Sequence, residues 1–223
     1  MPRILVFASG SKDGGGSGFR WLIHGMLIGL LKAVIVGVVS NHEHGGVRKI
    51  ADQYGIPFVH LANRHPSAGE YRDIRDLFQP DLIVFSGWLL FVLGINGVNI
   101  HPGLLPETGK KHGGAVHAEA IRLFHLGLIP CTAVTMHMIV EEDNEVADPE
   151  RYDCGPILFV YGVYIEPGDD AESLGHRVNE VEHGRQTEVT SWIAQGLVGW
   201  TKERGVFAPP GYPYLTLPTP LTR

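Results

Sequence analysis

The chain has 223 residues, of which 44% are hydrophobic and 19% are charged, and its formal net charge is -6. This length and composition predict a globular protein with one main core, and the acidic balance argues against a general nucleic-acid-binding surface. Two cysteines cannot form a disulfide framework, and no apolar run reaches the roughly 18 residues of a membrane span, so we expect a cytoplasmic protein that binds neither nucleic acid nor a membrane.

The first half of the chain alternates short apolar runs with helix-like segments. The runs are rich in β-branched and aromatic residues, which is typical of buried strands, and the segments between them have the length and apolar content of helices. Repeated strand and helix units of this kind imply a parallel, right-handed, doubly wound sheet up to about residue 100. We expect strands at residues 3–9, 34–40, 57–61 and 81–87, and helices at residues 19–33, 45–55 and 69–79.

The second half has a different pattern. Two segments in which apolar and polar residues alternate flank a polar stretch, which predicts antiparallel strands joined by a long connection. We expect these strands at residues 132–140 and 156–165, helices at residues 113–127 and 169–196, and a proline-rich surface tail at residues 199–223.

Together these elements predict an α/β fold. A Rossmann-like parallel sheet in the N-terminal half is followed by antiparallel strands and a long helix in the C-terminal half. No internal repeat and no linker separates the halves, so we expect a single domain over residues 1–223, with its halves meeting near residue 100 and the tail beginning after residue 198.

A glycine-rich loop follows the first expected strand. Five of the nine residues at 10–18 are glycine, and the loop leads into a helix. Free backbone N–H groups and the helix dipole favour an anion at such a position, so a phosphate would fit. The loop lacks the lysine-serine ending of a P-loop and a clean dinucleotide fingerprint, and a plain flexible turn explains it equally well.

The segment "NIHPGLLP" at residues 99–106 places polar residues at the end of an apolar strand. Asn99 and His101 are two positions apart on an extended segment and share one face. Ligands of open parallel sheets collect beyond the carboxyl ends of the strands, where an amide can donate to a developing oxyanion and an imidazole can move a proton. The simpler alternative is that Asn99 bonds to the backbone and that His101 is a half-buried structural histidine.

The segment "YDCGPI" fixes a carboxylate where the polar connection meets the next strand. Asp153 precedes a Gly-Pro turn, so its backbone is well defined. A carboxylate there would hold His101 and raise the pKa of its imidazole, because an opposite charge stabilises imidazolium. An Asx turn or a strand cap explains Asp153 equally well.

Other candidates carry weaker signals. His42 and His44 have a metal-like spacing but no assignable third ligand, so we expect no metal. Cys154 has no sequence feature that would stabilise a thiolate. The apolar run at residues 88–92 is explained by core packing, although a flat heteroaromatic ligand would also need such a wall.

Three segments together carry a family resemblance: "NIHPGLLP", "DCGPI" about fifty residues later, and the N-terminal loop from "ASG" to "GSGF". In these motifs the sequence resembles the formyltransferase family that uses 10-formyltetrahydrofolate, and its single-domain length is similar to that of the stand-alone members in purine synthesis. The resemblance implies a formyltransferase fold with a phosphate-binding first half and a catalytic, folate-binding second half. It also implies transfer of a formyl group to the amine of glycinamide ribonucleotide through a tetrahedral intermediate.

The resemblance also implies roles for particular residues. Asn99 would hold the formyl oxygen, His101 would donate a proton, and Asp153 would tune and orient His101. The positions implied for the acceptor, with its phosphate on the glycine loop, are Gly16, Ser17, Gly18, Asn179, Glu180, Val181 and Glu182. The positions implied for folate are Leu89, Leu90, Phe91, Val92, Pro149, Glu150, Arg151 and Tyr152, together with Asn99 and Asp153.

The sequence departs from the family pattern mainly around the folate. Leu90 stands at the usual arginine-like position, the segment between Val92 and Asn99 is short, and the connection at residues 141–153 is expanded. Three alternatives stay open: formylation of an amino-sugar nucleotide, hydrolysis of formyl-folate, and binding of folate or a nucleotide without catalysis. The partners expected are therefore small molecules, and the protein is expected to be a monomer or a homodimer.

Overall fold

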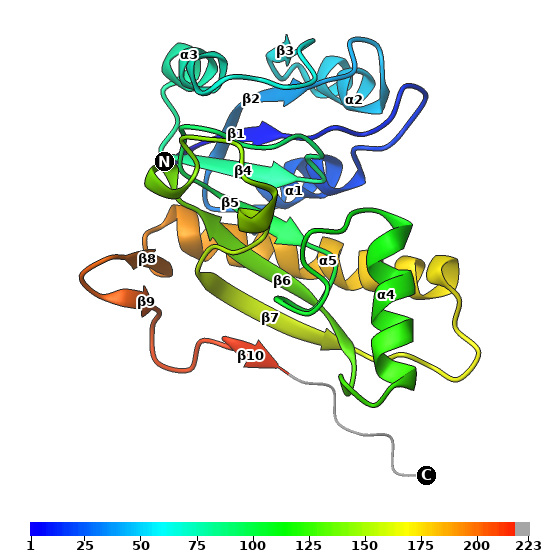
Figure 1. The fold of residues 1–223 in the computed structure, drawn as a ribbon. Helices are drawn as coiled ribbons and strands as arrows, with labels where there is room; N and C mark the ends of the chain where they lie inside the picture. Colours follow the sequence, from blue (N-terminus) through cyan, green and yellow to red (C-terminus); the bar gives the residue numbers. More distant parts are fainter. Residues whose placement is uncertain (217–223) are drawn as a thin grey trace.

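The computed structural model describes residues 1–216, and one eight-stranded sheet runs through the middle of the protein (Figure 1). The pairs from β3 to β5 are parallel, whereas β6 is antiparallel to both β5 and β7. The predicted change from a parallel to an antiparallel half is confirmed. The order across the sheet is β3 (Phe58–His60), β2 (Val34–Ser40), β1 (Arg3–Phe7), β4 (Leu82–Ser86), β5 (Gly97–His101), β6 (Thr132–Ile139), β7 (Ile157–Val163) and β10 (Leu215–Thr216).

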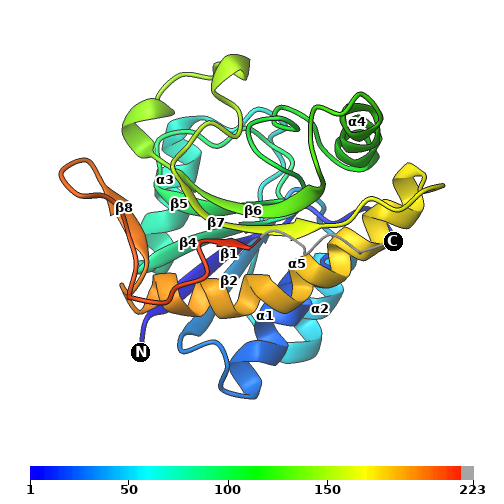
Figure 2. The same cartoon turned by 90° about the horizontal axis from the view of Figure 1, so that it is seen from below.

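Helices cover both faces of this sheet. Figure 2 shows α1 (Ser17–Leu27), α2 (Gly46–Tyr54) and the long α5 (Ala171–Ala194) on one face and α3 (Ala68–Phe78) on the other, while α4 (Gly114–His125) packs against α5. Side chains of a strand alternate between faces, so Ile4 and Val6 join the core beneath α1, whereas Leu5 and Phe7 join the core beneath α3. None of the helices in residues 1–216 is long and apolar enough to cross a membrane.

The chain reverses its direction across the sheet between β1 and β4. From β1 it proceeds outward to β2 and β3, and then returns to β4 and β5 on the other side of β1. In sheets of this type, ligands bind beyond the carboxyl ends of the strands at such a reversal. The glycine loop follows β1, residues 87–92 follow β4, and Asn99 and His101 end β5, so the fold brings these segments to one edge.

The buried side chain of Gln186 in α5 links two of the segments at this edge. Gln186 accepts a hydrogen bond from Ser86 Oγ at the end of β4 at 3.1 Å, and its amide donates to the Gly18 carbonyl in α1 at 3.5 Å. The start of α1 and the end of β4 are therefore held in a fixed relation to α5.

The structure corrects two expectations about element boundaries. Helix α1 ends at Leu27 rather than near residue 33, because Gly29 takes a φ of 75° and the N–H of Leu30 turns back to the Gly25 carbonyl. The tail is more than a surface segment: β8 (Gly199–Thr201) and β9 (Gly205–Phe207) form a hairpin, and β10 pairs in parallel with β7. Residues 217–223 of the predicted tail lie outside the described residues.

Candidate active site

Two adjoining cavities lie beyond the carboxyl ends of β1, β4 and β5. We call the first the apolar cavity, which residues 90–92, 138–140 and 151–155 line. We call the second the glycine-loop cavity, which residues 10–11, 15–18 and 111–113, together with one face of α5, line. Trp88, Asn99, Tyr152 and Asp153 line both cavities. A ligand in one cavity would therefore meet a ligand in the other at these side chains.

Asn99, His101 and Asp153 come together at this junction. Strand β5 carries Asn99 and His101, and Asp153 Oδ2 lies 3.6 Å from His101 Nδ1. The Asp153 carboxylate also accepts the backbone N–H of Lys110 at 3.1 Å. The side chains of His101 and Asp153 are only 4% and 5% exposed, so water screens their interaction little. The structure thus brings the three residues into one cluster, and their catalytic roles stay predictions.

A second histidine, which the sequence analysis did not single out, belongs to the same cluster. His137 lies opposite Asn99 in the register of β5 and β6, with its Nε2 at 3.1 Å from Asn99 Nδ2 and 3.4 Å from Asp153 Oδ1. Its Nδ1 donates to the Met138 carbonyl at 3.0 Å. The only sequence feature that could have indicated His137 is its place inside a largely apolar strand. Its approach to Asn99 depends on the register between distant strands, which cannot be predicted from the sequence. His137 links the amide of Asn99 to the carboxylate of Asp153.

Burial determines the charge of His101. Loss of water around the imidazole lowers the pKa of His101 to about 4, although the Asp153 carboxylate acts in the opposite direction. Burial also raises the pKa of Asp153, but the hydrogen bond with His137, the neighbouring His101 and the backbone N–H of Lys110 bring it below its ordinary value. The expectation of a raised pKa for His101 is therefore wrong, because desolvation outweighs the carboxylate. At neutral pH a neutral His101 lies beside an ionised Asp153.

The glycine loop shapes the start of α1. Gly15 and Gly16 both have a φ of 80°, a conformation that glycine adopts without strain. Within the described part of the chain, no side chain caps this helix, so its first backbone N–H groups remain available to an anion. The predicted residues Gly16, Ser17 and Gly18 all line the glycine-loop cavity.

Helix α5 supplies the opposite wall of the glycine-loop cavity. Asn179 and Glu182 are three positions apart and line the cavity from one face of the helix. Glu180 is exposed and Val181 packs against the core, so neither reaches the cavity. The structure brings two of the four residues predicted on this helix to the site.

Comparisons with known proteins agree with this geometry. The profile of the family described as formyl transferase matches residues 2–190. The chain belongs to the formyl transferase family. It is 30% identical to the chloroplastic phosphoribosylglycinamide formyltransferase of Arabidopsis thaliana, over 92% of this chain and 69% of that protein. The phosphoribosylglycinamide formyltransferase of Mycobacterium tuberculosis is also 30% identical, over 81% of this chain and 79% of the relative. The solved structure of the phosphoribosylglycinamide formyltransferase of Coxiella burnetii has a TM-score of 0.73 and 27% identity, over 93% of each chain.

In this member of the formyl transferase family, most positions predicted to bind folate line the apolar cavity. They are Leu90, Phe91, Val92, Asn99, Arg151, Tyr152 and Asp153. Leu89 lines the glycine-loop cavity instead, and its N–H bonds to Ser9 Oγ at 3.0 Å. Pro149 and Glu150 line neither cavity, because they lie in an exposed turn where Glu150 pairs with Lys110.

The weaker candidates lie in a loop after β2 or in the wall of the apolar cavity. His42 and His44 lie in the loop after β2, and among the side chains that the structure describes no group of three or more His, Cys, Asp or Glu could hold a metal ion. Cys154 lines the apolar cavity, where its Sγ lies 3.3 Å from the carbonyl oxygens of both Glu150 and Tyr152 and its one S–H can donate to either.

Burial of Glu182 makes the free energy of unfolding of this formyl transferase depend on pH. Burial raises the pKa of Glu182 to about 7 from an ordinary value of 4.5, so the native state holds the proton more tightly and loses stability as pH rises through this window. We expect Glu182→Gln, which is neutral in both states, to be more stable than the wild type at pH 8 by up to about 3 kcal/mol. Urea unfolding at pH 8 and pH 4 measures the difference, which should vanish at pH 4.

The matched control for this prediction is Glu180→Gln, two positions away on the exposed face of α5. This control should show no gain that depends on pH. Equal stability of Glu182→Gln and the wild type at pH 8 would contradict the effect of burial.

Proposed function

We propose that this chain transfers the formyl group of 10-formyltetrahydrofolate to the amine of N1-(5-phospho-D-ribosyl)glycinamide, a step of purine synthesis. The observation that carries the proposal is the position of Asn99, His101 and Asp153 at the junction of two cavities, where two bound substrates would meet. The names of the relatives in Arabidopsis thaliana and Mycobacterium tuberculosis support the choice of acceptor. The proposal includes a cytoplasmic location and a monomeric or homodimeric state.

The apolar cavity suits the folate cosubstrate. Flat aromatic rings bind well between apolar and aromatic side chains with a few polar groups at the edge. Leu90, Phe91 and Val92 supply one apolar wall, and Phe91 contacts the Tyr152 ring edge to face at a centroid distance of 5.1 Å. Asn99 and Asp153 supply polar groups where this cavity opens into the other. The formyl-bearing end of the folate would lie at this opening.

The glycine-loop cavity suits the ribonucleotide acceptor. The uncapped start of α1 offers backbone N–H groups and a favourable dipole to the phosphate. Asn179 and Glu182 on the facing helix would bind the glycinamide end. This arrangement directs the acceptor amine toward His101, which lines the same cavity.

The chemistry is a direct attack of the amine on the formyl carbon. The new C–N bond gives a tetrahedral species with an anionic oxygen, which the Asn99 amide stabilises by donating a hydrogen bond. The contact between Asn99 Nδ2 and His137 Nε2 at 3.1 Å holds the amide in place beside the cavity junction. His101, neutral before the reaction, takes the proton released by the amine and passes it to N10 of the folate as the C–N10 bond breaks. Asp153 stabilises the imidazolium that forms between these steps.

The proposal is tested by following the absorbance change of 10-formyltetrahydrofolate with glycinamide ribonucleotide, without an acceptor, and with an amino-sugar nucleotide. We expect the donor to lose its formyl group only in the assay that contains glycinamide ribonucleotide. Loss without an acceptor would assign a hydrolase, and loss only with the amino-sugar nucleotide would assign a different transferase. Binding without turnover in every arm would leave a binding protein.

A negative charge placed in the glycine loop should raise the KM for the acceptor without raising the KM for the formyl donor. Ser17→Asp puts a carboxylate at the first position of α1, where it would repel the acceptor phosphate. We expect the KM for glycinamide ribonucleotide to rise by about tenfold or more, with little change in the KM for the formyl donor. The matched control is Ala171→Asp at the first position of α5, which lines neither cavity. An unchanged acceptor KM in Ser17→Asp would show that the acceptor phosphate does not bind at this loop.

A further inference from the structure

The two outer walls of the apolar cavity are both attached to α3. The first wall is the segment 88–94, which follows β4, and the second is the segment 140–145, which follows β6. Tyr71 of α3 donates its hydroxyl proton to the Phe91 carbonyl at 2.8 Å and accepts the Trp88 indole N–H at 3.0 Å. The first wall is therefore anchored to the helix through backbone and side chain.

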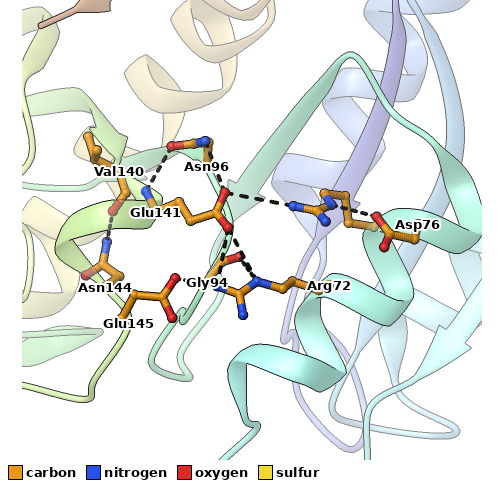
Figure 3. Close-up of polar contacts among 9 residues, drawn as sticks. Arg72, Asp76, Gly94, Asn96, Val140, Glu141, Asn144 and Glu145 are labelled. Atoms are coloured by element: carbon orange, nitrogen blue, oxygen red, sulfur yellow. Dashed lines mark hydrogen bonds and ion pairs between the residues drawn. The ribbon is translucent and has the colours of Figure 1, made fainter.

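Arg72, the next residue of α3, reaches both walls at once (Figure 3). Its Nε donates to the Gly94 carbonyl in the first wall at 3.0 Å. Its Nη2 lies 3.3 Å from Glu141 Oε1 in the second wall and also pairs with Glu145. A planar guanidinium can hold such a fork of acceptors, whereas a lysine ammonium is a single point charge.

The two walls are also tied directly to each other beside Arg72. The Gly94 N–H donates to the Asn144 carbonyl at 3.0 Å. Just beyond the first wall, the Asn96 side chain accepts the Glu141 N–H at 2.9 Å. Within the second wall, the Asn144 amide donates to the Val140 carbonyl at 2.9 Å. Figure 3 shows Asn96, Asn144 and Val140 around Glu141. Arg75 Nη1 lies 3.9 Å from Glu141 Oε2.

These two walls overlap the segments that the sequence analysis interprets as departures from the family pattern, a short segment at residues 92–99 and an expanded connection at residues 141–153. The contacts of Arg72 join the shortened segment to the expanded one. Phe91 and Val92 in the first wall, and Val140 and Asn144 in the second, all line the apolar cavity. The separation of these walls therefore fixes the width of the cavity.

We propose that Arg72 is a positioning residue for the formyl donor: it holds the walls 88–94 and 140–145 at the separation that admits the folate. The inference rests on the proposed function, because it takes the apolar cavity as the donor site. Arg72 lines neither cavity itself and acts through the segments it contacts. Its side chain is 35% exposed and that of Glu141 is 29% exposed, so solvent weakens the ion pairs and a moderate effect follows.

The test compares steady-state kinetics of the full-length wild type with Arg72→Ala, Arg72→Lys and Glu141→Gln. We expect Arg72→Ala to raise the KM for 10-formyltetrahydrofolate by about three- to tenfold, with the KM for the acceptor and kcat changed less than twofold. Arg72→Lys should give an intermediate value, because it keeps the charge and loses the fork. The double variant Arg72→Ala with Glu141→Gln should have nearly the same donor KM as Arg72→Ala alone, because both substitutions remove the same ion pair between Arg72 and Glu141.

The matched control is Arg122→Ala, which removes an ion pair between Arg122 and Glu119 on α4 and should leave the donor KM unchanged. Calorimetric titration with tetrahydrofolate checks that the KM effect is a binding effect. An unchanged donor KM in Arg72→Ala, or equal increases in both KM values, would overturn the inference while wild-type turnover still supported the proposed function. Absence of formyl transfer by the wild type would remove the proposed function and this inference with it.

Discussion

Replacing His101 by alanine is expected to lower kcat by about 10² to 10⁴, the usual contribution of a positioned proton-transfer group. His101 lines the glycine-loop cavity within 3.6 Å of Asp153, and burial keeps it neutral at the start of the reaction. Without the imidazole, no group in this position takes the proton of the attacking amine. Single-turnover measurement with both substrates saturating separates this loss from a loss of binding.

The control for His101→Ala is His24→Ala. His24 is a partly buried histidine of α1 that contacts Tyr54 Oη at 2.9 Å and lines neither cavity. This control should keep a rate within about twofold of the wild type, because it leaves the transition state untouched. Circular dichroism should show both variants folded. A folded His101→Ala with a normal single-turnover rate would remove His101 from the mechanism.

Replacing Asn99 by aspartate is expected to lower kcat by about 10² to 10³, the cost of losing one oxyanion donor. The substitution keeps the size of the side chain but exchanges the N–H donor for a carboxylate oxygen, which repels the oxygen that becomes negative in the transition state. Asn99 lines both cavities and lies 3.1 Å from His137, so its position is fixed before the substrate arrives. The reduction should fall on kcat more than on either KM.

Asn63→Asp provides the same chemical change at an exposed site. Asn63 bonds to Glu70 at 3.0 Å on the surface and lines neither cavity. Its kcat should match that of the wild type. A rise in the donor KM with kcat preserved in Asn99→Asp would show that Asn99 binds the ground state rather than the transition state.

Most of the fold could be predicted because the hydrophobic pattern repeats along the chain. The apolar runs that became β2 and β4 match their predicted bounds within a residue or so, and the alternating segments became the antiparallel pair β6 and β7. The end of α1 was missed because the apolar pattern continues past Gly29, where the backbone turns. Strand β10 was missed because two residues among prolines carry no periodic signal, and its pairing depends on where the folded sheet leaves an edge.

Part of the candidate site could also be predicted from the sequence, and part could not. Asn99, His101 and Asp153 could be predicted as a group because short motifs fix them, and the structure brings them together. His137 could not, since its approach to Asn99 depends on the register between β5 and β6. The charge of His101 could not be predicted either, because the carboxylate partner is visible in sequence and the desolvation that opposes it is not.

The C-terminal tail protects an open edge of the sheet. β7 would otherwise present unpaired backbone groups to solvent, which makes a template for strands of other molecules. The Tyr214 carbonyl accepts the Val160 N–H at 2.8 Å, and the hydroxyls of Tyr212 and Tyr214 donate to the carbonyls of Leu158 and Ile157, each at 3.0 Å. Pro213, which precedes Tyr214, has no N–H with which to recruit a further strand. Residues 212–216 therefore cover part of the β7 edge, which would otherwise be open to pairing with strands of other molecules.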